Sequence, residues 1–211
     1  MTEEPGRRER KKAATRRHIA DTAREMFLER GFDAVGIREI AAAADVAVTT
    51  LFSHFPSKEA LAFDEGQKRE DRLVQAVTGR GAEQTIPDAL REHFRAVVED
   101  FARPAAVTFW RLVDDSPALR EYASTMWQRH EDALTTVIAA DLGLPKSSTT
   151  CRAFSHYVLG VYPLAREAPD PMAAVDEIFD LITPGWIEID VSGFHGAART
   201  GPEPYHGAES S

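Results

Sequence analysis

Residues 36–59 restrict the fold of this 211-residue chain more than any other part of it. Within residues 37–44, apolar side chains recur at the i, i+3, i+4, i+7 spacing of one helix face, which predicts a short helix. Asp45 follows, where a tight turn between helices needs the left-handed backbone that aspartate tolerates better than most residues. A second helix is expected over 47–55, because Pro56 disfavours a helical residue before it. Two short helices joined in this way are typical of helix-turn-helix DNA readers.

A basic segment precedes these helices. Residues 7–17 carry seven arginine or lysine side chains and one glutamate, a net charge of +6, although the whole chain carries −9. The excess acid lies in residues 61–211, which carry −10, whereas residues 1–60 carry +1. Charges act within about 8 Å at physiological salt, so a basic segment can bind phosphate on an acidic protein. Residues 1–12 are therefore expected to form a disordered basic arm, which either contacts DNA or only adds solubility.

The remaining pattern predicts an all-α protein of about nine helices, with an N-terminal helix-turn-helix domain and a C-terminal helical domain. Only the run 186–191 has strand-like composition. The other helices are expected over 15–30, 57–78, 88–102, 106–114, 117–142, 147–166 and 171–183. The expected parts are the basic arm (1–12), a DNA-binding domain (13–60, its helix-turn-helix proper 36–55), a connecting helix (57–78), a ligand-binding and dimerisation domain (85–184) and a flexible tail (193–211).

Several classes of function are disfavoured by what the chain contains. Its one cysteine, Cys151, excludes an intrachain disulfide and fits a reducing compartment. No apolar run reaches the roughly 20 residues of a membrane span, and no hydrophobic signal core begins the chain, so a cytoplasmic protein without a membrane partner is expected. The seven histidines are scattered, without a zinc-protease motif, metal-spaced cysteines or a phosphate-binding glycine loop. We therefore expect no enzyme, no cofactor and no metal site.

Three runs of residues resemble the tetracycline-repressor (TetR) family of bacterial regulators. They are Ala23-x-x-x-Phe27 with Gly31-Phe32, then Ile37-Arg38-Glu39-Ile40-Ala41, then Thr50-Leu51-Phe52-Ser53-His54-Phe55-Pro56-Ser57-Lys58-Glu59. The resemblance covers roughly residues 12–75 and implies an all-α homodimer with a small DNA-binding domain and a divergent ligand-binding domain. The chain departs from the family pattern at Gly36, Asp45 and Phe52, where threonine, glycine and tyrosine are usual.

The resemblance also implies which side chains contact DNA. The helical period places Leu51 and Phe55 in the core and turns Thr49 and Ser53 outward. Val48 and Phe52 could instead belong to the core stripe, and Arg38 could pair with Glu39 or Asp33. Base contacts are expected from Arg38, Val48, Thr49 and Phe52. Phosphate contacts are expected from Arg16, Arg17, Thr50, Ser53, His54 and Lys58.

Two further sites are expected in the C-terminal domain, because such a reader needs a partner subunit and a signal. The dimer contacts are expected from Phe154, Val158, Val161, Ala174, Ile178 and Leu181, which could instead be intrachain core. An apolar pocket is expected among aromatic residues with polar tips, which could equally be core. Its candidate residues are His93, Phe94, Phe101, Phe109, Trp110, Trp127, His130, Tyr157 and Tyr162.

The predicted function is sequence-specific binding of near-palindromic double-stranded operator DNA, with repression released by a small-molecule effector of unknown identity. Activation is the alternative direction of control. Two other interpretations remain open at this level. A redox sensor would depend on the thiol of Cys151, and a constitutive DNA-binding protein would have no effector.

Overall fold

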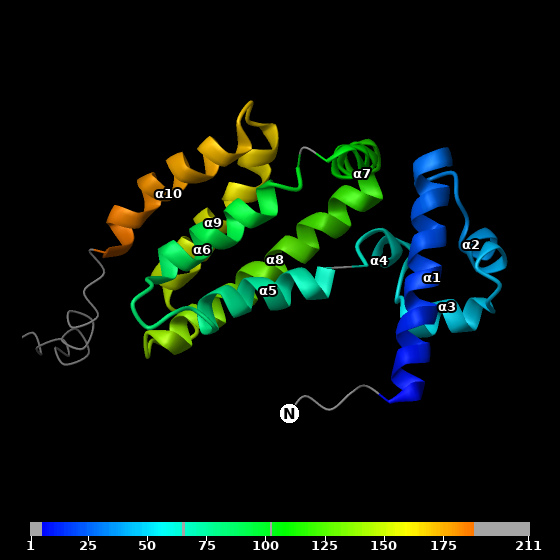
Figure 1. Ribbon diagram of the computed structural model, residues 1–211, viewed down its shortest axis with the longest axis horizontal. Helices are drawn as coiled ribbons and strands as arrows, with labels where there is room; N and C mark the ends of the chain where they lie inside the picture. The colour runs from blue at the N-terminus through cyan, green and yellow to red at the C-terminus, as the bar shows by residue number, and fades with distance from the viewer. Residues whose placement is uncertain (1–5, 65, 102, 188–211) are drawn as a thin grey trace, which may run out of the picture.

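The computed structural model describes residues 6–64, 66–101 and 103–187, and within these ranges the protein consists of ten α-helices without a strand. The all-α prediction is confirmed, with one helix more than expected. Figure 1 shows α1 to α4 at one end of the molecule and most of the later helices at the other. The helices are α1 (Arg7–Arg30), α2 (Ile37–Ala43), α3 (Val48–His54), α4 (Lys58–Ala62), α5 (Gly66–Thr78), α6 (Ile86–Val98), α7 (Pro104–Asp115), α8 (Pro117–Asp141), α9 (Thr149–Glu167) and α10 (Pro171–Ile187).

Single residues set several helix ends as the sequence predicts. Gly31 ends α1 with a φ of 81°, a conformation that costs glycine little. Asp45 has a φ of 50° in the turn between α2 and α3, so the predicted left-handed aspartate is confirmed. The Ser57 hydroxyl accepts a hydrogen bond from the backbone N–H of Ala60 at 3.3 Å and caps α4.

Two helix predictions are wrong in their extent. The first helix begins at Arg7, so residues 7–12 are helical and not a disordered arm; arginine, lysine and alanine dominate this run and favour helix. The predicted helix over 57–78 is interrupted after Ala62, where Phe63 has a φ of −103° and a ψ of 37°. Phe63 is buried there against two rings, Phe109 and Tyr122, whose centroids both lie 5.4 Å away.

Predictions for Pro104 and for the run 186–191 also change. Pro104, expected to close a helix, lies in the first turn of α7, where its missing N–H costs no hydrogen bond. In the strand-like run, Trp186 and Ile187 belong to the end of α10. Residues 188–191 and the predicted tail over 193–211 lie outside the described residues.

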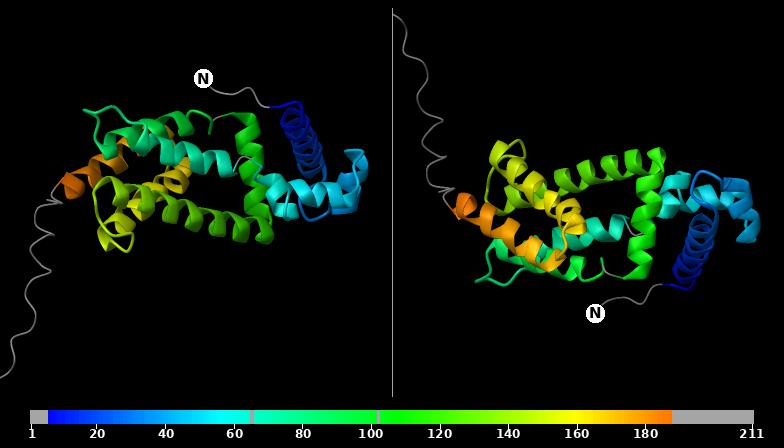
Figure 2. Two further views of the ribbon diagram at one scale, coloured as in Figure 1. Left: turned by 90° about the horizontal axis from the view of Figure 1, so that it is seen from below. Right: turned by 90° about the horizontal axis from the view of Figure 1, so that it is seen from above.

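The buried side chains form two cores that meet at one junction. The first combines α1 to α4 with Val113 of α7 and the first half of α8, and the second lies among α5, α6, α8, α9 and α10. Trp110 and Trp127 pack against both. Figure 2 shows α7 lying across the junction, and the Ser116 hydroxyl after it donates to Asp33 Oδ1 at 3.0 Å. The end formed by α1 to α4 therefore rests directly on helices of the second domain.

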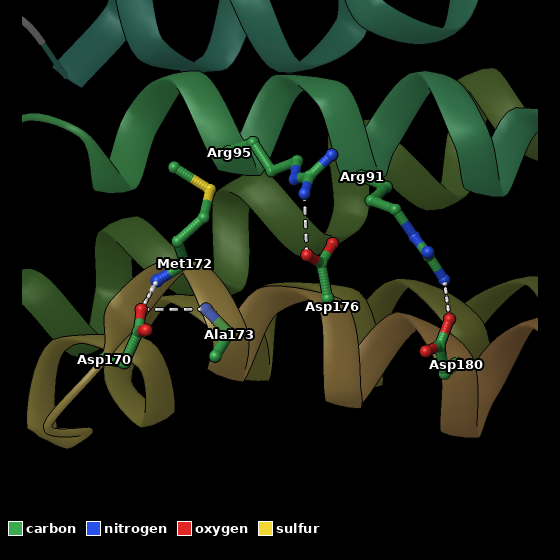
Figure 3. Close-up of polar contacts among 7 residues, drawn as sticks. All are labelled: Arg91, Arg95, Asp170, Met172, Ala173, Asp176 and Asp180. Carbon is green, nitrogen blue, oxygen red and sulfur yellow. Dashed lines mark hydrogen bonds and ion pairs between the residues drawn. The ribbon is translucent and has the colours of Figure 1, made fainter.

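The last helix, α10, is held on α6 by ion pairs (Figure 3). Arg95 Nη2 lies 2.7 Å from Asp176 Oδ2, and Arg91 pairs with Asp180 one turn further along. Asp170 Oδ1 accepts hydrogen bonds from two backbone N–H groups at the start of α10, each at 3.0 Å. These contacts fix which face of α10 packs inward and which remains exposed.

Candidate DNA interface and effector cavity

Helix α3 presents the face that the period of its sequence predicts. Leu51 and Phe55 have no exposed surface, and Thr49, Phe52 and Ser53 are exposed on the opposite side. Phe52 is 47% exposed, which is unusual for a phenylalanine and leaves its ring available to a partner. The core alternative is therefore excluded for Phe52.

Val48 and Thr50, at the edges of this face, are half-buried. Val48 packs against the first core, so the alternative that assigned it to the core stripe describes its environment better. The carbonyl oxygen of Thr50 accepts a hydrogen bond from the Ser53 hydroxyl at 2.7 Å. The hydroxyl hydrogen of Ser53 is therefore already donated within α3.

Arg38 extends from the first turn of α2 and is exposed. The two carboxylates that could have neutralised it have other partners: Glu39 accepts from Gly36 N at 2.7 Å and from Arg30 at 2.9 Å, and Asp33 accepts from Ser116. The Gly36 N–H and then Arg30 lower the pKa of Glu39, which keeps it ionised. Among the described residues Arg38 has no ion pair, so its guanidinium is free.

Lys58 and Arg16, both predicted to contact phosphate, use their charges within the protomer. Lys58 Nζ donates to the carbonyl oxygen of Phe32 at 2.6 Å and lies 4.0 Å from the centre of the Phe32 ring. Its partial burial lowers the pKa of Lys58. The guanidinium carbon of Arg16 lies 4.1 Å from the centre of the Phe55 ring, and Arg16 Nη2 lies 2.7 Å from Asp64 Oδ1. Arg16 thus joins α1 to the end of α3 and to Asp64, and Lys58 joins α4 to the turn after α1. These intrachain partners disfavour the predicted phosphate contacts of both residues.

His54 lies at the end of α3, where its backbone carbonyl accepts a hydrogen bond from Arg16. Its Nδ1 is buried and has no hydrogen-bond partner among the described residues. Burial first, and then the charges of Lys12 and Arg16, lower the pKa of His54. A neutral imidazole can still donate one N–H to a phosphate, but it adds no charge.

The remaining basic side chains of α1 are exposed. Arg16, one turn after Lys12, donates a hydrogen bond to the His54 carbonyl, which places the basic first turns of α1 beside the end of α3. A positive surface therefore borders the exposed face of α3. Its members are Arg7, Arg8, Arg10, Lys11, Lys12 and Arg17.

A cavity of about 690 Å³ lies at the junction of the two domains. Its size is that of a site for a small organic molecule. Tyr157 does not reach it: this side chain is 62% exposed on the far side of α9, so its assignment to the pocket is wrong. The other candidates all line the cavity, namely His93, Phe94, Phe101, Phe109, Trp110, Trp127, His130 and Tyr162. The sequence did not single out Arg24, Leu28, Ala62, Phe63, Arg69, Arg72 and Arg103, which also line it.

Three titratable groups of this wall, His93, His130 and Tyr162, are uncharged at neutral pH. Burial, and then the charge of Arg72, lowers the pKa of His93 to about 4. Burial also lowers the pKa of His130, which is 2% exposed, and raises the pKa of Tyr162. Nε2 of His130 has no hydrogen-bond partner among the described residues. These three side chains therefore add neutral polar atoms to the aromatic surface of the wall.

The predicted dimer contacts on α9 lie on its inner face. Phe154, Val158 and Val161 are at most 6% exposed within one protomer, so they are core and not a free surface. The exposed apolar side chains of α9 are Tyr157 and Leu164, seven residues apart and hence on one face, with Leu164 57% exposed. Val158 directly follows Tyr157, so the predicted face is turned by about 100° around α9 from the exposed one.

Of the dimer contacts predicted on α10, Leu181 is 78% exposed. Ala174 and Ile178 are half-buried and pack partly against the second core. Helices α9 and α10 pack on each other, and both carry exposed apolar side chains. We call Tyr157, Leu164, Ala174, Ile178 and Leu181 the outer apolar face.

Other kinds of site receive little support in the parts of the chain described. No group of three or more histidine, cysteine, aspartate or glutamate side chains is placed to hold a metal ion. None of the described helices is both long and apolar enough to cross a membrane. The thiol of Cys151 has no exposed surface, which disfavours the redox-sensor interpretation.

Comparison with known proteins divides the chain in the same way as the structure. A family of bacterial regulatory proteins, the tetR family, matches residues 19–64, and the MftR C-terminal domain matches residues 84–186. The transcriptional regulator TcmR of Streptomyces glaucescens is 30% identical over 148 residues, 66% of each chain. The putative mycofactocin biosynthesis regulator MftR of Mycobacterium tuberculosis is 25% identical over 185 residues, 83% of this chain and 93% of the relative. The repressor AlkX of Dietzia sp. has the same fold, with a TM-score of 0.58 at 17% identity over 82% of this chain and 97% of that one.

Proposed function

The chain belongs to the TetR family of helix-turn-helix transcriptional regulators, with an MftR-like C-terminal domain, and we propose that it is a homodimeric repressor released from its operator by a small-molecule effector. Members of this family are not enzymes, in agreement with the sequence prediction. DNA binding follows from the family. The dimer, the direction of control and the effector are the proposal.

The exposed face of α3 supports reading in the major groove. A groove accepts one helix, and side chains from its first turns reach the base edges. Thr49 and Phe52 can contact bases there, the Phe52 ring against a thymine methyl group. Arg38 on α2 has a free guanidinium whose fork fits O6 and N7 of guanine. Arg17 and the other exposed basic residues of α1 would supply phosphate contacts.

A dimer is proposed because one small domain contacts too few base pairs for specificity. Two copies related by a twofold axis read a near-palindromic operator, with half-sites about 34–36 Å apart or one turn further. The outer apolar face is the proposed contact, because exposed leucines and a tyrosine on a packed helix pair can complete a four-helix bundle with a second copy.

The cavity wall supports effector control, because part of it belongs to the DNA-binding domain. Arg24 and Leu28 come from α1, and Ala62 and Phe63 come from the end of α4. An effector in the cavity would therefore contact helices that carry α3.

A chain of contacts leads from this wall to the reading helix. Asp64 lines the cavity and pairs with Arg16, which in turn donates a hydrogen bond to the His54 carbonyl at the end of α3. A shift of Asp64 by an effector would move the support of α3 and change the spacing of the two readers. Such coupling is typically about 1–3 kcal/mol.

Repression is the proposed direction, because a dimer bound over a promoter excludes polymerase without any further contact. The protein would act in the cytoplasm, where its operator lies. The single observation that carries the effector proposal is the cavity shared by the two domains; a constitutive DNA-binding protein has no use for it.

Selection from a random pool of duplexes, followed by footprinting, tests the proposal. We expect one near-palindromic sequence to be enriched, protected over two half-sites, and released by at least one compound of a metabolite panel. If a sequence is enriched but no compound releases it, the effector part of the proposal fails. If no sequence is enriched at moderate salt, the operator part fails as well.

A further inference from the structure

Positively charged side chains outnumber negatively charged ones around the cavity. Four arginines line it, and only two carboxylates do, Asp64 and Asp100. His93 and His130 are neutral near pH 7, so they add no charge. The wall therefore carries an excess of positive charge on a protein whose net charge is −9.

Most of these charges are already paired. Asp64 lies 2.7 Å from Arg16, and Asp100 lies 3.0 Å from Arg103. Arg24 lies 3.1 Å from Asp21 on its own helix. Both carboxylates of the wall and two of its arginines are thus accounted for.

Two arginines remain, Arg69 and Arg72 on α5. Within the described ranges of the chain, neither guanidinium group makes a hydrogen bond or an ion pair. Arg69 lines the cavity together with Tyr162 and His130, and its charge lowers the pKa values of both. Arg69 is also partly buried, and an arginine withdrawn from water without a counter-charge is costly, which favours binding of an anion.

The same wall contains a continuous series of aromatic rings. Phe63 and Phe109 have centroids 5.4 Å apart, Phe109 and Trp110 5.3 Å, and Trp110 and Tyr162 5.5 Å. Trp127 continues the series at 4.7 Å from Tyr162. Such a wall makes favourable contacts with a flat apolar body, through ring edges and faces.

We propose that the cavity binds an aromatic carboxylate, whose flat body lies against the Trp110–Tyr162–Trp127 rings and whose carboxylate pairs with Arg69. The inference deepens the proposed function and rests on it, in that the cavity is taken to be the effector site. Arg72, more exposed than Arg69, adds long-range attraction. Planar two-point pairing with a carboxylate is the geometry that a guanidinium provides and an ammonium does not.

Calorimetry with a matched pair of probes tests the charge preference on the full chain without DNA. The probes are 2-naphthoate and 2-naphthamide, which share a ring system and differ in charge. We expect at least tenfold tighter binding of the acid. Arg69→Gln should abolish this preference by weakening the acid about tenfold and leaving the amide unchanged, and Arg69→Lys should retain part of it. Arg111→Gln, an exposed arginine of α7 outside the cavity, is the control and should behave as the parent protein.

Each outcome is informative about the site alone, because no operator is present. Equal affinity for the two probes, no binding of either at millimolar concentration, or an undiminished preference in folded Arg69→Gln would overturn the inference. A separate assay of release from the selected operator tests the proposed function. If the acid binds selectively but does not release the operator, the aromatic carboxylate site is supported and the effector role is rejected. If only neutral compounds release the operator, the effector role is supported and the preference for an aromatic carboxylate is rejected.

Discussion

Arg38 and Lys58 were both predicted to contact DNA, but their surroundings differ. Arg38 is exposed and has no ion pair within the described residues, whereas Lys58 Nζ bonds to the Phe32 carbonyl and lies against its ring. A side chain without intrachain partners can be replaced at little cost to folding. The two residues can therefore be separated by measuring folding and binding independently.

Arg38→Ala should weaken operator binding by about 1–3 kcal/mol at the base pairs that Arg38 reads, because a bidentate contact to guanine is lost. The free energy of unfolding should change by less than about 0.5 kcal/mol. Fluorescence anisotropy on operator and random duplexes, with urea denaturation, checks both. Equal losses of affinity on the two duplexes would reject its role as a base reader.

Lys58→Met should lower the free energy of unfolding by about 1–2 kcal/mol, because it removes a hydrogen bond to a backbone carbonyl and a cation–π contact and keeps the apolar stem. Urea denaturation measures this loss. The dependence of operator affinity on salt should be unchanged. If the variant is as stable as the parent protein and the salt slope falls by about one, Lys58 is a phosphate contact after all.

His93 should make the stability of the protein depend on pH. Its pKa is about 4 in the folded state and near 6.5 when unfolded, so between these values the unfolded chain binds the proton more readily. Stability is therefore complete above about pH 6.5 and should fall by about 1–3 kcal/mol as the pH drops to 4. His93→Gln should reduce this dependence, and denaturation midpoints at pH 7.5, 6 and 4.5 for both proteins measure the difference. His130 also makes stability fall at low pH, but equally in the parent protein and in His93→Gln. Identical pH profiles of the two proteins would therefore contradict the low pKa of His93.

At the scale of the elements, the turn between α2 and α3 contains a strained residue and sets the orientation of the two helices. Asp45 holds a φ of 50°, and this conformation fixes the angle between the two helices of the reader. Because the strain comes from the Cβ atom, glycine removes it, and a β-branched residue increases it.

Asp45→Gly should raise the free energy of unfolding by about 0.5–1 kcal/mol and leave operator affinity unchanged, since glycine adopts positive φ without steric cost. Asp45→Val should lower it by about 1–2 kcal/mol through the Cβ clash. Thermal denaturation of both variants provides the measurement. A destabilised glycine variant would show that the aspartate side chain makes a contact worth more than the strain.

At the scale of the whole molecule, the outer apolar face is the proposed contact between two subunits. Large apolar side chains exposed to water often mark a protein–protein contact. Leu164 of α9 is 57% exposed and Leu181 of α10 is 78% exposed. Their positions leave the protomer core untouched, so charges introduced there test association without disturbing the fold.

The double variant Leu164→Glu/Leu181→Glu should be a folded monomer with operator affinity reduced at least a hundredfold, because each half-site then binds alone. Sedimentation velocity and circular dichroism check the state and the fold. Val107→Glu, which changes a comparably exposed residue of α7 (46%), should remain a dimer. A double variant that still sediments as a dimer would place the interface elsewhere.

Much of the reader could be predicted from the sequence, because short-range rules govern it. The left-handed Asp45, the buried Leu51 and Phe55, and the Ser57 cap each depend on residues a few positions away, through backbone sterics, helical period and capping. The composition of the cavity was also predictable in large part, since aromatic residues with polar tips gather on the helices that surround it.

The tertiary structure alone decided which charges and faces remain free. Arg16 is bound to Asp64, 48 positions away, and Lys58 to Phe32, 26 positions away, and no period of the sequence records such pairings. The break after Ala62 and the exposed face of α9 likewise follow from packing between distant helices. Helical period says which side chains share a face, but only the neighbouring helices determine whether that face is covered.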